Sequence, residues 1–137
     1  MEMLPSGLPE VVADEEDLAR FLMSRSQFNS TMVKPSAFLP EIEDRETSVF
    51  RHGSEPRHTL WALGDELAAQ GRTIHGAAII KAQSVRNAQL DVIADEPPPR
   101  HAAIRNWGGT ENDPDLRKAQ HKELANLLAR DAQLLKK

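Results

Sequence analysis

The C-terminal stretch of the chain, 113-DPDLRKAQHKELANLLARDAQLLKK-137, has the most regular hydrophobic pattern in the sequence. Its apolar residues recur at intervals of three and four positions, which is the spacing of one face of an α-helix. Asp113 can cap the first turn, Pro114 suits the first helical position, and Lys136 and Lys137 complement the helix dipole at the other end. The pattern predicts one long amphipathic helix that runs to the end of the chain.

Two further helices are predicted upstream. Segment 14–26 has large apolar residues at three- and four-residue intervals behind an acidic first turn. The residues expected to face the core there are Leu18, Phe21 and Leu22. A middle helix is predicted over residues 55–70, with Ser54 as its candidate N-cap and Gly71 where left-handed backbone is favoured. Residues 84–88 are expected to form one helical turn.

Extended segments are predicted between these helices. β-branched and small apolar residues alternate or cluster there between turn residues, with an irregularity expected at Gly76. Pro35 cannot donate a ladder hydrogen bond, so residues 31–39 are expected to be an edge strand or simply extended. The predicted strands span residues 47–52, 73–82, 90–94 and, as a last edge strand, 102–107.

The order of these elements predicts an α+β fold. A small, mainly antiparallel sheet of about three to five strands would carry the N-terminal, middle and C-terminal helices. We expect a single domain over residues 13–137, because the chain of 137 residues is long enough to bury one core. Residues 1–12 contain Pro5, Gly7 and Pro9, and are expected to form an irregular or partly disordered lead.

The composition excludes several classes of protein. The chain has no cysteine, which excludes disulfides, thiolate metal sites and cysteine nucleophiles. No apolar run approaches the roughly 18 residues that a membrane span needs, and no secretory signal is visible. We therefore expect a cytoplasmic protein with no membrane contact. Arginine outnumbers lysine and alanine is abundant, which is typical of a GC-rich bacterial genome.

Charge is unevenly distributed along the chain. The formal net charge is −4, but residues 1–17 alone carry −6 and residues 100–137 carry +3. An acidic chain argues against a general nucleic-acid-binding protein, which normally presents a strongly basic face. The C-terminal helix could still offer nucleic acid a modest basic strip, although solvated helix faces explain the same charges.

Three Arg-His dipeptides are candidate anion-binding residues. They are Arg51-His52, Arg57-His58 and Arg100-His101. Arg57 and His58 are predicted in the first turn of the middle helix, where the dipole disfavours cations, and a bound phosphate or carboxylate would relieve this conflict. The alternative is that Glu55 pairs with an arginine. The histidine spacing matches no metal motif and no cofactor-binding motif is present, so neither a metal nor a cofactor is expected.

A second group of residues predicts a protein interface. Trp107 follows the stiff segment Pro97–Pro99, and tryptophan is enriched at interfaces. The predicted C-terminal helix also carries two adjacent leucine pairs, broad enough to cover the sheet and reach a second chain. The candidate interface residues are Trp107, Leu127, Leu128, Leu134 and Leu135. The alternative is that Ile104 and Trp107 close the core under that helix.

Two functions follow from these residues. The first is a small accessory or regulatory subunit without catalytic activity, which acts through a protein partner or as a homodimer. It predicts an exposed apolar patch on the last helix or beside Trp107. The second is a small enzyme or binding domain for a phosphorylated or nucleotide-like ligand, with His58 or His101 as acid or base. It predicts that these histidines share one pocket with Arg51 and Arg57.

Overall fold

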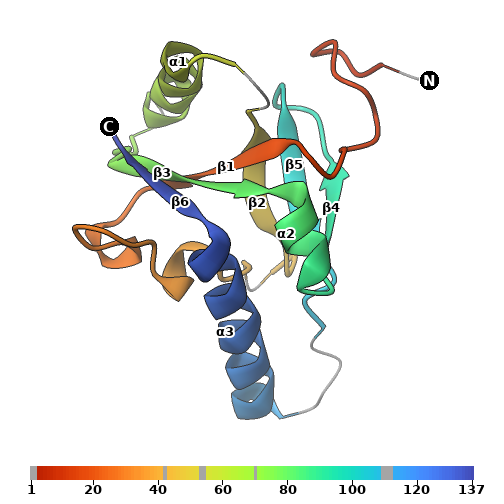
Figure 1. The fold of residues 1–137 in the computed structure, drawn as a ribbon, viewed down its shortest axis with the longest axis vertical. Coiled ribbons are helices and arrows are strands. Elements are labelled where there is room, and N and C mark those ends of the chain that lie inside the picture. The colour runs from red at the N-terminus through yellow and green to blue at the C-terminus, as the bar shows by residue number, and fades with distance from the viewer. Residues whose placement is uncertain (1–2, 42, 53–54, 70, 109–112) are drawn as a thin grey trace.

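Strand β1 (Asp17–Leu22) lies inside a sheet of six antiparallel strands, in the order β4-β5-β2-β1-β3-β6 (Figure 1). The computed structural model describes residues 3–41, 43–52, 55–69, 71–108 and 113–137. The other strands are β2 (Thr47–Arg51), β3 (Gly76–Lys81), β4 (Asp91–Ala94), β5 (His101–Arg105) and β6 (Gln133–Lys136). The helices are α1 (Arg57–Ala68), α2 (Ala82–Asn87) and α3 (Pro114–Asp131), with short 3-10 helices η1 (Arg25–Gln27) and η2 (Pro35–Ala37).

The sheet separates two hydrophobic clusters. Val85 of α2 and Leu128 of α3 pack with the larger cluster, while Leu60 of α1 packs with the smaller one. Figure 1 shows α1 at one end of the molecule, far from α3. The fold is therefore the predicted α+β class with a long C-terminal helix, but its sheet has more strands than expected.

The predicted N-terminal helix is wrong, because its apolar residues form β1. Strand β1 pairs with β2 on one side and β3 on the other, so both of its faces are covered. Leu18 and Leu22 enter the larger cluster, while Ala19 and Phe21 enter the smaller one. A strand buried on both faces carries a nearly continuous apolar run, and in a short segment this run imitates helical spacing.

The predicted helix at the C-terminus begins as expected but ends early. Asp113 caps α3 and Pro114 opens it, while Ala132 leaves the helix with extended backbone. The residues after it form β6, which pairs antiparallel with β3. Leu134 packs with the larger cluster and Leu135 with the smaller one, so this leucine pair straddles the sheet instead of extending the helix face.

Most of the other predicted elements are confirmed with shifted boundaries. Helix α1 and strands β2, β3 and β4 occupy the expected segments, although the predicted cap Ser54 lies outside the described residues. Strand β5 is not an edge strand, because β4 and β2 flank it. Residues 31–39 form no strand: Val33 makes an isolated bridge to Phe28, and η2 follows.

The acidic N-terminal segment is bound to the domain by ion pairs. Glu16 pairs with Arg51, Asp17 with Lys81 at 2.8 Å, and Asp14 with Arg86. Residues 3–12 are irregular, yet Val12 is buried in the core. The uneven charge of the sequence therefore serves internal contacts at this end.

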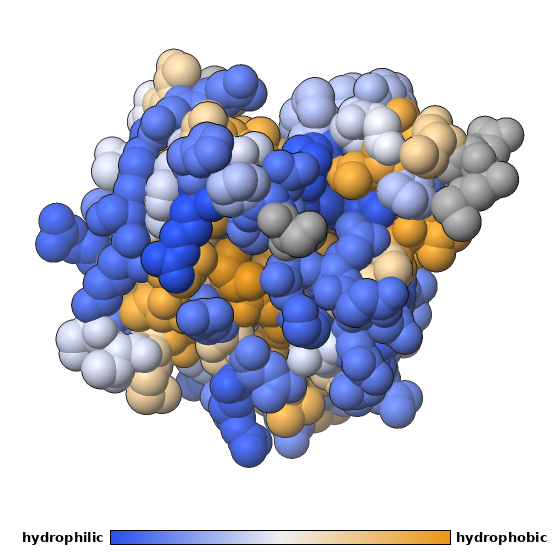
Figure 2. Space-filling view, turned by 45° about the horizontal axis from the view of Figure 1, so that its top comes forward, coloured by the Kyte–Doolittle hydropathy of each residue, from blue (hydrophilic) through white to orange (hydrophobic). Residues whose placement is uncertain are grey.

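The surface carries separate hydrophobic patches between hydrophilic side chains, as Figure 2 shows for one face. Exposed large apolar residues include Met32, Leu39, Leu116 and Leu127. In the described part of the chain, no helix is both long and apolar enough to cross a membrane.

Candidate functional site

The Arg51 guanidinium is not available to a ligand. Arg51 is fully buried, and two of its nitrogens lie 2.8 Å from the two carboxylate oxygens of Glu16. A third nitrogen donates to the carbonyl oxygen of Pro9 at 2.7 Å. This bidentate pair holds the N-terminal segment against β2, because both partners are charged and screened from water.

The six Arg-His residues do not share one pocket. Arg57 and His58 are exposed on the first turn of α1, and Arg57 borders a hollow beside β6. The His101 ring lies edge-on to Phe50, with Nδ1 2.8 Å from the carbonyl oxygen of Asp95. The geometry therefore separates the histidines that were predicted as acid or base from Arg51.

Arg51, His52 and Arg100 do line one hollow of about 300 Å³ between β2 and α1. Arg100 donates to the carbonyl oxygen of Arg51 at 2.7 Å and lies 3.9 Å from Glu55, which also lines the hollow. Burial lowers the pKa of His52, while Asp17 and Glu55 oppose that shift and Arg100 adds to it. The hollow therefore mixes cations with carboxylates.

The predicted interface residues also lie in different environments. Trp107 is only 3% exposed, and its indole Nε1 donates to the carbonyl oxygen of Ile104 at 3.1 Å. This is the core position that the sequence left open as an alternative. Leu128 is fully buried, while Leu127 is 40% exposed. Leu134 and Leu135 are half-buried in β6, so the five residues do not form one surface.

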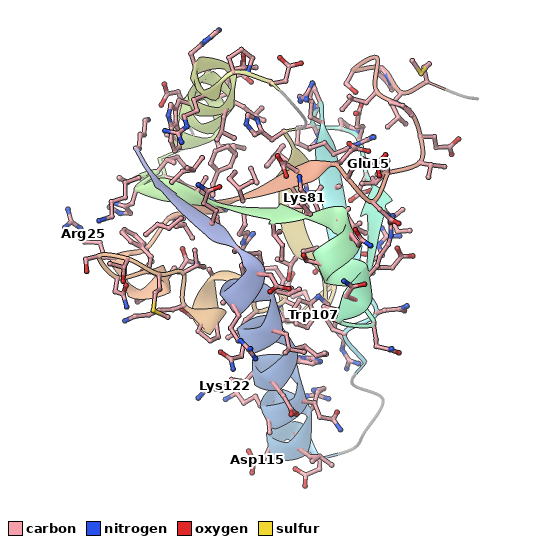
Figure 3. All side chains as sticks on the ribbon, viewed as in Figure 1. Glu15, Arg25, Lys81, Trp107, Asp115 and Lys122 are labelled. Carbon is pink, nitrogen blue, oxygen red and sulfur yellow. The ribbon has the colours of Figure 1, made fainter. Side chains whose placement is uncertain are left out.

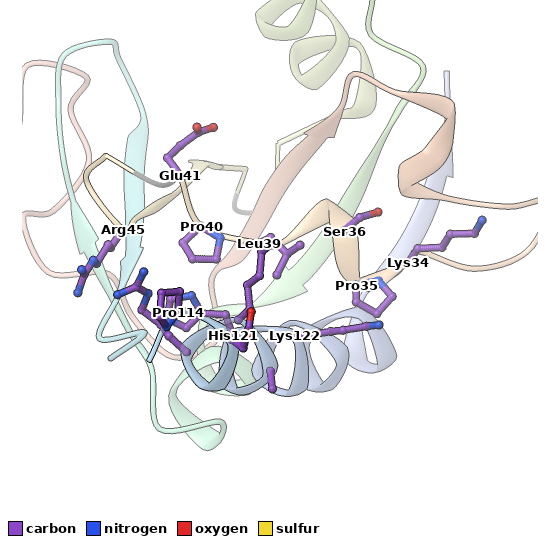
Figure 4. Close-up of a pocket in the computed structure, with 14 residues that line it drawn as sticks. Lys34, Pro35, Ser36, Leu39, Pro40, Glu41, Arg45, Pro114, His121 and Lys122 are labelled. Carbon is purple, nitrogen blue, oxygen red and sulfur yellow. The ribbon is translucent and has the colours of Figure 1, made fainter. Parts of the chain in front are cut away.

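A further hollow lies beside the first half of α3, where the sequence indicated only a modest basic strip. We call it the α3 groove; its volume is about 880 Å³, and its walls are α3 and the segment around η2 (Figure 4). One wall contributes Lys34, Pro35, Ser36, Leu39, Pro40, Glu41 and Arg45. The other contributes Pro114, Asp115, Arg117, Lys118, Ala119, His121 and Lys122.

The wall around η2 is anchored to the sheet. Ala37 and Phe38 are fully buried, and Thr47 donates to the carbonyl oxygen of Phe38 at 2.7 Å. Arg20 of β1 donates to the carbonyl oxygen of Ala37 at 2.8 Å, and burial is the main cause that lowers the pKa of this arginine. Leu39 extends from this wall toward α3 (Figure 4). Because buried residues and hydrogen bonds fix this wall, the groove is formed without a ligand.

The α3 wall is fixed by its cap and by Trp107. The Asp113 carboxylate accepts from the backbone N–H of Asp115 at 2.9 Å, which satisfies a free donor of the first turn. The His121 ring lies edge-on to Trp107, with centroids 5.9 Å apart. Trp107 lies beside α3 (Figure 3), and because His121 also lines the groove, the indole supports a residue of this wall.

The chain matches no protein-family model, no curated protein and no solved structure. Within the described residues, no group of three or more His, Asp or Glu is placed to hold a metal ion. The groove instead offers ammonium, guanidinium and aliphatic groups, which bind by charge, hydrogen bonding and apolar contact. One feature of the sequence indicates the groove. Along one side of α3, Lys122 and Lys118 come one and two turns before the apolar residues Ala125, Leu128 and Ala129.

Proposed function

We propose that this chain is a protein-interaction module, an accessory or regulatory subunit that docks a segment of a partner protein in the α3 groove. The observation that supports this function best is the groove itself. It is large, its walls combine apolar residues with the aliphatic stems of charged side chains, and the described residues of the chain leave it open. Small-molecule sites are typically preformed hollows of roughly 300–1,000 Å³ with mainly apolar walls, and peptide segments also dock in hydrophobic grooves.

The walls of the groove favour a polypeptide occupant. Pro35, Leu39 and Pro40 oppose Pro114 and Ala119 across it. Proline-rich walls are stiff, so a bound segment would not have to order them, and this lowers the entropic cost of docking. Leu39 is 39% exposed, and burying it against a partner would remove apolar surface from water.

A pair of tryptophan variants on the same helix tests this function. Ala119 lines the groove, whereas Asn126 is exposed on α3 outside it. Short random peptides displayed on phage would be selected for binding to the full chain, and each selected peptide retested on Ala119→Trp and Asn126→Trp. We expect Ala119→Trp to abolish binding because the indole fills the groove, and Asn126→Trp to retain it.

Light scattering on the same variants tests the homodimer form of this function. A dimer of the wild-type chain that becomes a monomer only in Ala119→Trp would make a second copy the occupant. Selected peptides that bind both variants equally would place the interaction elsewhere and refute the proposal. Thermal unfolding of both variants controls for folding, and Ser36→Trp, on the opposite wall, repeats the test independently.

A further inference from the structure

Cationic side chains outnumber anionic ones around the α3 groove. Its lining contains five cations and two carboxylates, in a chain whose overall net charge is −4. The cations are Lys34, Arg45, Arg117, Lys118 and Lys122. The first turns of α3 add the partial positive charge of the helix N-terminus. The local charge of the groove therefore opposes the overall charge of the chain.

The two carboxylates do not neutralise this surplus. Glu41 points away from α3 (Figure 4), and its charge acts on Arg20 beneath the η2 wall. Asp115 lies in the first turn of α3, where it complements the helix dipole. Across the described ranges, no ion pair involves Lys34, Lys118 or Lys122.

The lysines of α3 occupy the side of the helix that would normally be apolar. Lys118 and Lys122 lie one turn apart and lead, at three-residue steps, to the buried residues Ala125 and Leu128. Like charges four residues apart in a helix repel each other and cost stability. Lys34 lies on the opposite wall at the same end as Lys122, with its side chain directed away from α3 (Figure 4).

The groove suits a polypeptide better than a nucleic acid. Its lining contains no Phe, Trp or Tyr on which unpaired bases could stack. Its aliphatic walls, Leu39 and the prolines, would face a polar phosphate backbone with no matching contact. A peptide can supply both carboxylates for the lysines and apolar side chains for these walls.

From this charge complementarity we infer that the occupant of the α3 groove is an acidic segment of a partner protein, with Asp or Glu beside aliphatic side chains. This inference rests on the proposed function and specifies its partner. The carboxylates pair with the ammonium groups of Lys118 and Lys122, while the aliphatic side chains contact Leu39 and Ala119. Electrostatic complementarity of this kind selects the partner and speeds its encounter.

Charge reversal tests the inference on peptides that already depend on the groove. We take the peptides that bind the full chain and Asn126→Trp but no longer bind Ala119→Trp. These peptides are sequenced, and their affinities are measured by fluorescence anisotropy. We expect these peptides to be rich in Asp and Glu. We expect the double variant Lys118→Glu/Lys122→Glu to bind them with an affinity lowered by about tenfold or more. The control Lys136→Glu, exposed in β6 outside the groove, should change affinity less than about twofold.

The outcomes separate this inference from the proposed function. One outcome is a set of peptides that depend on the groove, yet carry no surplus of Asp and Glu and bind the double variant unchanged. Such peptides would overturn the inference of an acidic partner, while the proposed interaction module would stand. If no selected peptide is sensitive to Ala119→Trp, both proposals fail. Binding of a single-stranded oligonucleotide that the double reversal abolishes would also overturn the inference, because the cations would then serve phosphate. Circular dichroism of each variant verifies that it remains folded.

Discussion

The two halves of α3 present the same side of one helix to different surroundings. In the second half this side carries Ala125, Leu128 and Ala129, all buried against the sheet. In the first half it carries Lys118, His121 and Lys122, which line the open groove. The second half stabilises the fold, and the first half is polar where packing would favour apolar residues. Departures from local stability rules are expected at functional sites, so the contrast supports our proposal that the first half binds a partner.

The largest expected effect is the truncation of the packed half. Leu128 is fully buried, and Leu128→Ala removes apolar contacts and leaves a cavity, so we expect a loss of about 3 kcal/mol of unfolding free energy. The adjacent Leu127 is 40% exposed, and Leu127→Ala should cost roughly 1 kcal/mol or less. Urea unfolding of both variants measures the difference. Equal losses would mean that the second half of α3 is not packed as described.

The next effect concerns the strand that follows the packed half. A Cβ atom at Gly76 would lie 2.5 Å from the carbonyl oxygen of Leu135, so Gly76→Ala must push β6 away from β3. We expect a loss of about 2 kcal/mol, within the range typical of overpacking. Hydrogen exchange should accelerate in residues 133–136, while β4 at the opposite sheet edge serves as the internal control. Unchanged exchange in β6 would contradict this close approach.

Sequence patterns located the elements that local chemistry determines. The cap and first turn of α3 were predictable because Asp113 and Pro114 act on their immediate neighbours. Strands β1 and β6 were not, because their conformation depends on partners far along the chain. The apolar run around Leu18 fits both a helix and a strand covered on two faces, and only pairing with β2 and β3 decides between them. The segment after Ala132 likewise becomes a strand because β3 offers it an open edge.

The site was less predictable than the fold. Arg51 was predicted to bind an anion, and its neutralising partner Glu16 lies 35 residues away in sequence. The α3 groove joins Leu39 to Ala119 across most of the chain, so no local motif could indicate it. The change from lysines to alanine and leucine along one side of α3 is visible in the sequence. Whether the lysines line a groove or face open solvent depends on where the core ends, and that is set by the tertiary structure.

A smaller effect is expected at the polar residue nearest to the boundary between the halves. The Nε2 atom of His121 is buried and has no hydrogen-bond partner among the described residues. His121→Phe keeps an aromatic ring beside Trp107 and removes the unsatisfied atom, so we expect a gain of about 1 kcal/mol. Thermal unfolding measures it, and His58→Phe, exposed on α1, provides a control near zero. A loss of stability in His121→Phe would show that the ring has a polar partner in solution.

The smallest expected effect is a change in stability on substitution of Lys118, and its direction is informative. Lys118 lies in the second turn of α3, four residues before Lys122, so the two like charges repel each other. Lys118→Gln should therefore stabilise the chain by about 0.3 kcal/mol in low salt, and the gain should shrink as salt screens the charges. Lys118→Arg retains the charge and should show no gain. Lys118→Gln should also weaken groove-dependent acidic peptides, so stability and affinity would change in opposite directions. A lysine that costs stability and contributes to binding marks a functional surface, whereas a loss of both in Lys118→Gln would assign Lys118 to the fold.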